Sequence, residues 1–169
     1  MSDRLHKFIA LPAAQKGLLM QAWLMLGWYR LLLAVRPLMC IVDSLEQHTG
    51  RCRVPDAVPF QQAEARMVGK LVASAAVVTP WQSRCLVQVL VVQRLLARRD
   101  ISGVVYIGAC RDGELASAAT AFSAHAWLVC GDAIVSGGAG HNDFTVLASF
   151  CWGETGRECH AVKSVSEHE

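Results

Sequence analysis

The residues from Thr79 to Arg98 form the stretch that most limits how this chain can fold. Between Leu86 and Leu96 the apolar side chains surround the helix axis almost completely, and such a helix belongs in the centre of a domain. Cys85 lies near the start of this predicted helix, where unpaired backbone N–H groups and the positive end of the helix dipole favour a thiolate. The sequence therefore predicts a buried central helix with a reactive thiol at its N-terminal end.

Two capping schemes for the start of this helix are open. With Ser83 as the N-cap, Cys85 is the second helical residue and lies within the field of the dipole. With Thr79 as the N-cap, Pro80 as the first helical residue and Gln82 as the third, Cys85 lies a turn further in. The first scheme favours chemistry at the thiol, and the second favours packing.

The composition indicates one domain whose surface is sparsely charged. The chain has 169 residues, of which 53% are apolar and only 18% charged, so part of the surface is expected to be covered by a partner or a membrane. A net charge of +2 and the absence of a basic cluster with interleaved aromatic residues argue against nucleic-acid binding. We predict a single domain over residues 1–169, with an apolar helical region and loop at 1–60, a core region at 61–152 and a polar tail at 153–169.

The cysteine pattern indicates reduced thiols and a cytoplasmic location. Seven cysteines occur without a C-x-x-C pair, and no secretory signal is recognised at the N-terminus. A zinc site from Cys151, Cys159 and His160 lacks the usual paired spacing of ligands, so no metal is predicted. The glycine-rich residues 137–140 lack the Lys-Ser/Thr ending of a phosphate loop, and no other cofactor motif is present.

The most apolar segment, at residues 17–42, is predicted to be a long buried helix. Its longest uncharged run has 13 residues, short of the roughly 20 that a transmembrane helix requires. Leu24, Leu31 and Val35 fall near one face of this helix, with Trp28 beside them. The alternative is a peripheral membrane contact or a surface that docks a partner.

The rest of the chain shows one more helix pattern and several strand patterns. Residues 43–59 are predicted to be a loop, and 61–78 an amphipathic helix with Glu64, Arg66 and Lys70 facing water. Ser102 and Gly103 are expected to end the central helix. Strand patterns follow at 104–110, 122–129, 133–136 and 143–152, with a two-residue turn at 131–132. We predict an α+β fold in two layers, with N-terminal helices packed on a small antiparallel sheet.

A cysteine that opens a helix and the A-H-A-W sequence around His125 on a later strand resemble the transglutaminase-like, papain-type cysteine peptidases. A narrower resemblance, over roughly residues 5–150, is to the leader peptidase of lasso-peptide biosynthesis, the B protein. The motifs that carry it are R-C-L at 84–86, L-L-A-R-R at 95–99, V-V-Y-I-G at 104–108 and F-S-A-H-A-W-L at 122–128. The resemblance implies a transglutaminase-like fold with the catalytic cysteine at the start of the central helix.

The resemblance also implies an activity and a set of partners. The activity is that of a cytoplasmic cysteine endopeptidase that removes the leader from a lasso-peptide precursor without a cofactor, with Cys85 as the nucleophile and His125 as the base. Residues 1–60 show no alternating strand pattern of a winged-helix module, so a separate leader-binding winged-helix protein is the implied partner. The precursor itself and an asparagine-synthetase-like cyclase are the other partners.

The third catalytic residue departs from the family pattern, because the position of the usual aspartate falls at Gly137. Asp143, at the start of the next predicted strand, is the first substitute, and Asn142 could do the same. Asp132 lies in the predicted hairpin turn, about 20 Å from His125 at about 3.3 Å per residue. A backbone carbonyl, or no third residue, is the remaining alternative.

Two further residues are candidates for contact with the substrate. The Gln82 side chain could donate to the oxyanion together with backbone N–H groups at the helix start. Trp127 follows the histidine by two residues and is a candidate for substrate binding.

Two other functions are compatible with the same residues. An acyltransferase could use the same cysteine and histidine, since an acyl-enzyme can pass to an amine as well as to water. The missing acid at Gly137 is also compatible with a catalytically inactive, peptide-binding scaffold.

Overall fold

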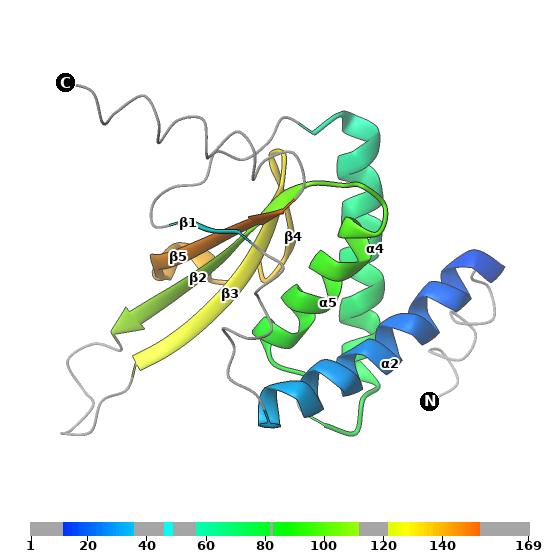
Figure 1. The fold of residues 1–169 in the computed structure, drawn as a ribbon, viewed down its shortest axis with the longest axis horizontal. Coiled ribbons are helices and arrows are strands. Elements are labelled where there is room, and N and C mark those ends of the chain that lie inside the picture. The colour runs from blue at the N-terminus through cyan, green and yellow to red at the C-terminus, as the bar shows by residue number, and fades with distance from the viewer. Residues whose placement is uncertain (1–11, 36–45, 49–56, 82, 112–121, 153–169) are drawn as a thin grey trace.

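The computed structural model describes residues 12–35, 46–48, 57–81, 83–111 and 122–152. Within these ranges the helices lie on one side of an antiparallel sheet (Figure 1), which confirms the predicted α+β fold in two layers. The helices are α2 (Ala13–Val35), α4 (Pro59–Val77) and α5 (Cys85–Ala97), with a short 3-10 helix η1 (His141–Asp143). The strands are β1 (Glu46–His48), β2 (Gly103–Arg111), β3 (Phe122–Cys130), β4 (Ala133–Ser136) and β5 (Thr145–Trp152).

The sheet has the strand order β1-β5-β2-β3-β4, with antiparallel pairs throughout. The predicted hairpin between β3 and β4 is confirmed, and Gly131 in its turn has a positive φ of 55°. The segment 46–48, predicted to be part of a loop, instead pairs with β5 as strand β1. Three polar residues are too few to show an alternating pattern, so the sequence gives no strand signal there.

The two faces of the sheet have different roles. Side chains on one face pack against the helices, and we call this the helix face; alternate residues point to the opposite face, which we call the far face. The helix face includes Val105, Ile107, Ala126, Leu128, Phe150 and Trp152, all of which lie in or against the main core. The far face includes Val104, Tyr106, His125 and Trp127.

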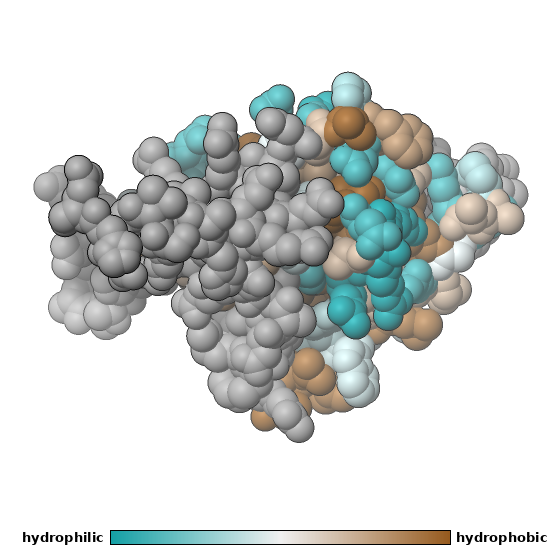
Figure 2. Space-filling view, turned by 45° about the horizontal axis from the view of Figure 1, so that its top comes forward, coloured by the Kyte–Doolittle hydropathy of each residue, from teal (hydrophilic) through white to brown (hydrophobic). Residues whose placement is uncertain are grey.

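The central helix α5 is buried on most of its surface, as predicted. It packs on β3 and against both α2 and α4. Helix α4 also lies on β4, where Gly69 touches the backbone of Val135 so closely that a side chain would collide with it. The opposite side of α4 exposes Arg66 and Lys70, as predicted, and Figure 2 shows hydrophilic side chains gathered over this helix. Glu64, which was also predicted to face water, is half-buried and forms an ion pair with Arg99.

The prediction of a buried N-terminal helix is wrong. Helix α2 buries only Leu18, Ala22 and Leu26, whereas its other faces expose Met20, Leu24, Trp28, Leu31 and Val35, each more than half accessible to solvent. By length and hydropathy this 23-residue helix could cross a membrane, so the argument that the segment is too short does not hold; a signal sequence or a core helix passes the same test, and no clear span is identified. Apolar composition alone cannot distinguish a helix face that is buried in the core from one that is exposed on the surface.

The prediction of reduced thiols is wrong at one position. Cys151 is disulfide-bonded, whereas Cys85, Cys110 and Cys130 form no disulfide. Sequence spacing does not reveal a pair that comes together only in the fold. A cysteine in a disulfide cannot ligate zinc, and the other two residues of the candidate zinc site, 159 and 160, fall outside the described part of the chain.

Candidate active site

Cys85 is the first residue of α5. Arg84 occupies the N-cap position in an extended conformation, and its side chain makes no capping hydrogen bond. The backbone N–H groups of the first turn therefore remain available to an anion, and the positive end of the helix dipole acts at the thiol. The Cys85 side chain is half-buried and packs against the main core. This position matches the predicted thiol at the start of a central helix.

A hydrogen-bonded turn precedes the start of α5. The Thr79 hydroxyl lies 2.7 Å from the carbonyl oxygen of Ala76, 2.9 Å from that of Trp81 and 3.1 Å from the Ser83 hydroxyl. Because Thr79 belongs to this turn, the scheme that made it the N-cap is wrong. The scheme with Ser83 as the N-cap is one residue early.

The imidazole of His125 is held by a backbone carbonyl. Its Nε2 atom lies 2.7 Å from the carbonyl oxygen of Gly137. A carbonyl oxygen can only accept, so Nε2 carries the proton and, in the neutral ring, Nδ1 is left as the base. A backbone carbonyl was one of the alternatives for the third residue, and the hydrogen-bond partner of His125 in the structure is the carbonyl of Gly137.

Gly137 can reach this place because it has no side chain. Its φ is 71°, in the left-handed region, and a Cβ atom there would collide with the carbonyl oxygen of Ala126. The backbone of residue 137 thus lies directly against β3, next to His125.

Aromatic rings fix the plane of the His125 imidazole. The ring stacks on Trp127 with centroids 6.1 Å apart and contacts Phe144 at 5.0 Å. Trp127 in turn stacks on Tyr106 at 5.6 Å. Only 5% of Trp127 is accessible to solvent, so its rings support His125 and offer little surface for substrate. The predicted contact between Trp127 and a substrate finds no support in this arrangement.

Neither of the predicted acidic partners of His125, Asp143 or Asp132, forms a hydrogen bond with it within the described part of the chain. Asp143 ends η1, is exposed, and precedes the Phe144 ring that touches the imidazole. Asn142 is also exposed in η1. Asp132 lies in the β3–β4 turn at the opposite end of β3, as predicted. Gln82, the predicted oxyanion donor, falls outside the described residues.

Helix α5 and strand β3 place Cys85 and His125 toward the same end of the two layers. From its last residue α5 leads back through a short turn into β2, and Cys85 is about 20 Å from that turn at 1.5 Å per residue. Gly108, the partner of His125 in the β2–β3 ladder, is about 17 Å from the start of β2. Figure 1 shows the start of α5 beside the middle of β3.

The two side chains nevertheless belong to different faces. Cys85 lies on the helix side, whereas His125 alternates with the core residues Ala126 and Leu128 and points to the far face. No hydrogen bond joins the Cys85 thiol to the imidazole among the residues that the structure describes. Strand β4 pairs with β3 only from Leu128 onward, so the strand edge beside His125 carries no further ladder in the described sheet.

A second cysteine lies on the same face as His125, and the sequence reasoning missed it. Cys110 pairs with Ser123 in the β2–β3 ladder, so it is the diagonal neighbour of His125 on the far face. The signal that could have found it was the alternation along β2, read together with the register of the hairpin. Cys110 is therefore the natural control for any test of Cys85.

Comparison with protein families gives one match. Residues 23–149 match the family model described as the transglutaminase-like superfamily. This range includes Cys85, His125 and Gly137. Comparisons with curated proteins and with solved structures gave no match.

Proposed function

We propose that this chain, which belongs to the transglutaminase-like superfamily, is a cysteine peptidase that removes the leader from a lasso-peptide precursor. The superfamily includes cysteine peptidases and acyltransferases and is typically catalytic. The observation that carries the proposal is the bond between His125 Nε2 and Gly137, because it leaves Nδ1 as the base. The peptide substrate comes from the resemblance of the R-C-L and F-S-A-H-A-W-L motifs to lasso leader peptidases.

In the proposed reaction His125 transfers two protons, one from the thiol to the leaving amine and one from water back to the sulfur. Nδ1 takes the proton of the Cys85 thiol, and the thiolate attacks the carbonyl carbon of the scissile peptide bond. The imidazolium then gives that proton to the leaving amine, and the C–N bond breaks to leave a thioester. Water then gives a proton to the same imidazole and attacks the thioester, and the C–S bond breaks to release the leader carboxylate. The imidazolium gives the proton from water to the Cys85 sulfur, which restores the thiol.

The helix start supplies the electrostatic part of the mechanism. The uncapped N–H groups of the first turn of α5 can donate to the negative oxygen of the tetrahedral intermediate. Gln82, which directly precedes Ser83 in this region, is the proposed side-chain donor. The proposal requires the Cys85 thiol, which lies on the helix side, to reach Nδ1 of His125 on the far face, while the Gly137 carbonyl holds Nε2.

The partners follow from the same resemblance. We propose that a separate winged-helix protein holds the leader, that the exposed apolar face of α2 is available for its docking, and that an asparagine-synthetase-like cyclase uses the freed core peptide. The exposed residues Leu24, Trp28, Leu31 and Val35 recur every three or four positions and therefore form one face of α2.

The test is incubation of the full chain with a candidate precursor, with and without a leader-binding protein, followed by mass spectrometry. We expect separate leader and core peptides with a free carboxylate on the leader. Cys85→Ala should abolish cleavage, whereas Cys110→Ala should retain most of it. Cleavage that survives in Cys85→Ala and disappears in Cys110→Ala would assign the nucleophile to the far face and overturn the proposal.

One structural observation favours a second candidate, a catalytically inactive peptide-binding scaffold. It is the placement of Cys85 and His125 on opposite sides of the sheet layer. A scaffold would bind the precursor but leave its mass unchanged in all variants. An acyltransferase would instead give a product whose mass shows a new amide, so the same spectra separate all three functions.

A further inference from the structure

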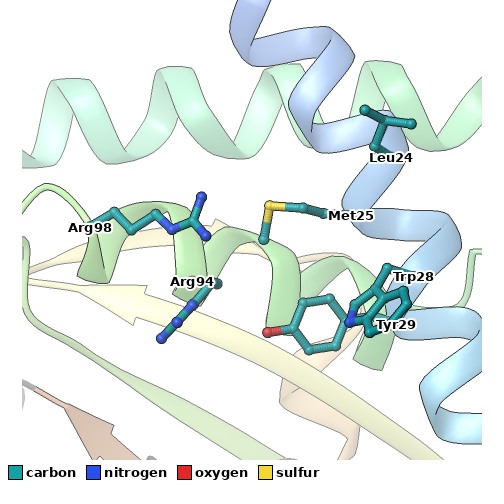
Figure 3. Close-up of a pocket in the computed structure, with 6 residues that line it drawn as sticks. All are labelled: Leu24, Met25, Trp28, Tyr29, Arg94 and Arg98. Atoms are coloured by element: carbon teal, nitrogen blue, oxygen red, sulfur yellow. The ribbon is translucent and has the colours of Figure 1, made fainter.

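A pocket opens between α2 and the C-terminal half of α5, away from Cys85. It has a volume of about 670 Å³ and is lined by Leu24, Met25, Trp28 and Tyr29 of α2 and by Arg94 and Arg98 of α5. Figure 3 shows the α2 side chains on one side of this space and the two arginines on the other. We call it the α2–α5 groove.

The two arginines of the groove have no carboxylate partner in the described part of the chain. The ion pair nearby joins Arg99 to Glu64 at 3.2 Å and leaves Arg94 and Arg98 out. Neither α2 nor α5 contains an aspartate or a glutamate. Because burial raises the pKa of the Tyr29 phenol while Arg94 and Arg98 lower it, the charges of both guanidinium groups reach into the apolar wall. The groove is therefore a positively charged recess.

The apolar wall of the groove is exposed as well. Trp28 is 61% and Leu24 59% accessible to solvent, although aromatic and aliphatic side chains of this size usually gain by burial. A surface that combines apolar side chains with paired guanidinium groups matches a ligand with an apolar side chain next to a carboxylate. Arginine binds a carboxylate through two parallel hydrogen bonds, so two arginines can hold two such groups.

We propose that the α2–α5 groove binds an acidic, amphipathic peptide segment, with an aromatic or branched aliphatic residue against Trp28 and carboxylates on Arg94 and Arg98. A recess of this size accepts one or two side chains, which suits a peptide better than a lipid surface. On the proposed function, the segment belongs to the leader of the precursor, and Leu24 and Trp28 then contact the leader while the exposed Leu31 and Val35 are left for the winged-helix protein.

The position of the groove fixes its distance from the proposed cleavage point. Arg94 and Arg98 follow Cys85 by nine and thirteen residues, or about 14 and 20 Å along α5 at 1.5 Å per residue. An extended peptide covers that distance in about four to six residues at about 3.3 Å each. The acidic segment of a leader held in the groove would thus lie about four to six residues from the scissile bond.

The binding test uses a fluorescent acetylated peptide that alternates glutamate with leucine and carries one tryptophan. Two matched peptides replace the glutamates by lysine or the leucines by serine. Fluorescence anisotropy should show binding of the first peptide only. Arg94→Gln combined with Arg98→Gln should weaken binding by about tenfold or more, and Trp28→Ala should weaken it comparably. These side chains are exposed, so the variants should keep the wild-type circular dichroism spectrum.

Arg30→Gln is the matched control, because Arg30 is an exposed arginine of α2 outside the groove; it should change the affinity by less than about twofold. Equal binding of the lysine or serine peptide, or unchanged affinity in the double arginine variant, would overturn the proposal. The proposal would also be overturned if the protein does not bind the peptide but binds vesicles of phosphatidylserine through Trp28.

The binding assay does not depend on catalysis and can be run in Cys85→Ala. If the protein cleaves the precursor but does not bind the acidic peptide, the groove proposal is refuted and the peptidase proposal stands. If the wild-type protein binds the acidic peptide but does not cleave the precursor, the peptidase proposal is refuted and the groove proposal stands.

Discussion

His125 Nε2 lies 2.7 Å from the carbonyl oxygen of Gly137. A carbonyl oxygen fixes the ring orientation and the tautomer but brings no full negative charge to stabilise the imidazolium. On the proposed function, the Gly137 carbonyl takes the place of a charged third residue and supplies its geometry without its charge. The consequences of this exchange can be tested at Gly137 itself.

Restoring the aspartate should damage the site. In Gly137→Asp, and equally in Gly137→Ala, the new Cβ would collide with the carbonyl of Ala126, and the left-handed backbone would be strained. The carbonyl must then move away from His125, and a misplacement of about 1 Å can lower the turnover by about 100-fold. Steady-state kinetics of precursor cleavage measure this loss as a fall in kcat.

Gly138→Ala is the matched control for that experiment. A Cβ at residue 138 would approach the Ile134 side chain at 3.1 Å and meets no backbone atom, so the side chain can adjust. We expect activity within about threefold of wild type, since surface substitutions of this kind change stability little. Full activity of Gly137→Asp would show that the carbonyl contact is dispensable.

The contact between α4 and β4 should depend on Gly69. Gly69→Ala places a methyl group against the backbone of Val135, and overpacking of this kind costs about 1–3 kcal/mol in the free energy of unfolding. Gly17→Ala is the same substitution in α2 with no neighbour within 4 Å of the new Cβ, and it should stabilise by about 0.5–1 kcal/mol. Urea unfolding of both variants checks the pair, and a stabilised Gly69→Ala would contradict the packing of these elements.

The protein should lose stability in alkali. Burial raises the pKa of Tyr29 above 10.0 and that of Cys130 above 9.0 in the folded state. Between the unfolded and the folded pKa the unfolded chain loses the proton first, so the free energy of unfolding is retained below pH 9 and falls as the pH rises. In Tyr29→Phe the free energy of unfolding should decrease less steeply above pH 10 than in the wild type. An unchanged pH dependence in that variant, measured by urea unfolding, would be inconsistent with a buried phenol.

Helix and strand patterns with many apolar residues could be predicted from the sequence, whereas single-residue details could not. The all-round apolar run of α5 predicts a central helix because nearly every side chain must be buried. The predicted end is too late, because α5 ends at Ala97 with Arg98 as its C-cap and Gly103 already belongs to β2. Asp100, with a φ of 54°, turns the chain so that the Ile101 N–H donates to the Leu96 carbonyl. Aspartate tolerates the left-handed region, so the expected glycine was not required.

The candidate site shows the same division. The positions of Cys85 at a helix start and of His125 on a strand were predictable from local patterns. The carbonyl of Gly137 was not singled out, because a backbone group has no signature of its own in a sequence. The separation of the thiol and the imidazole by the sheet layer was missed, since it depends on which strand face packs on the helices.

The most direct test of the central claim is the rate at which iodoacetamide alkylates Cys85 near neutral pH, read by peptide mass spectrometry in the wild type and in His125→Ala. A thiol that is paired with the imidazole should react faster than Cys110 and Cys130 and should slow by about tenfold or more without His125. An alkylation rate of Cys85 that is unaffected by His125→Ala would show that the two residues do not act together, and would contradict the proposed peptidase.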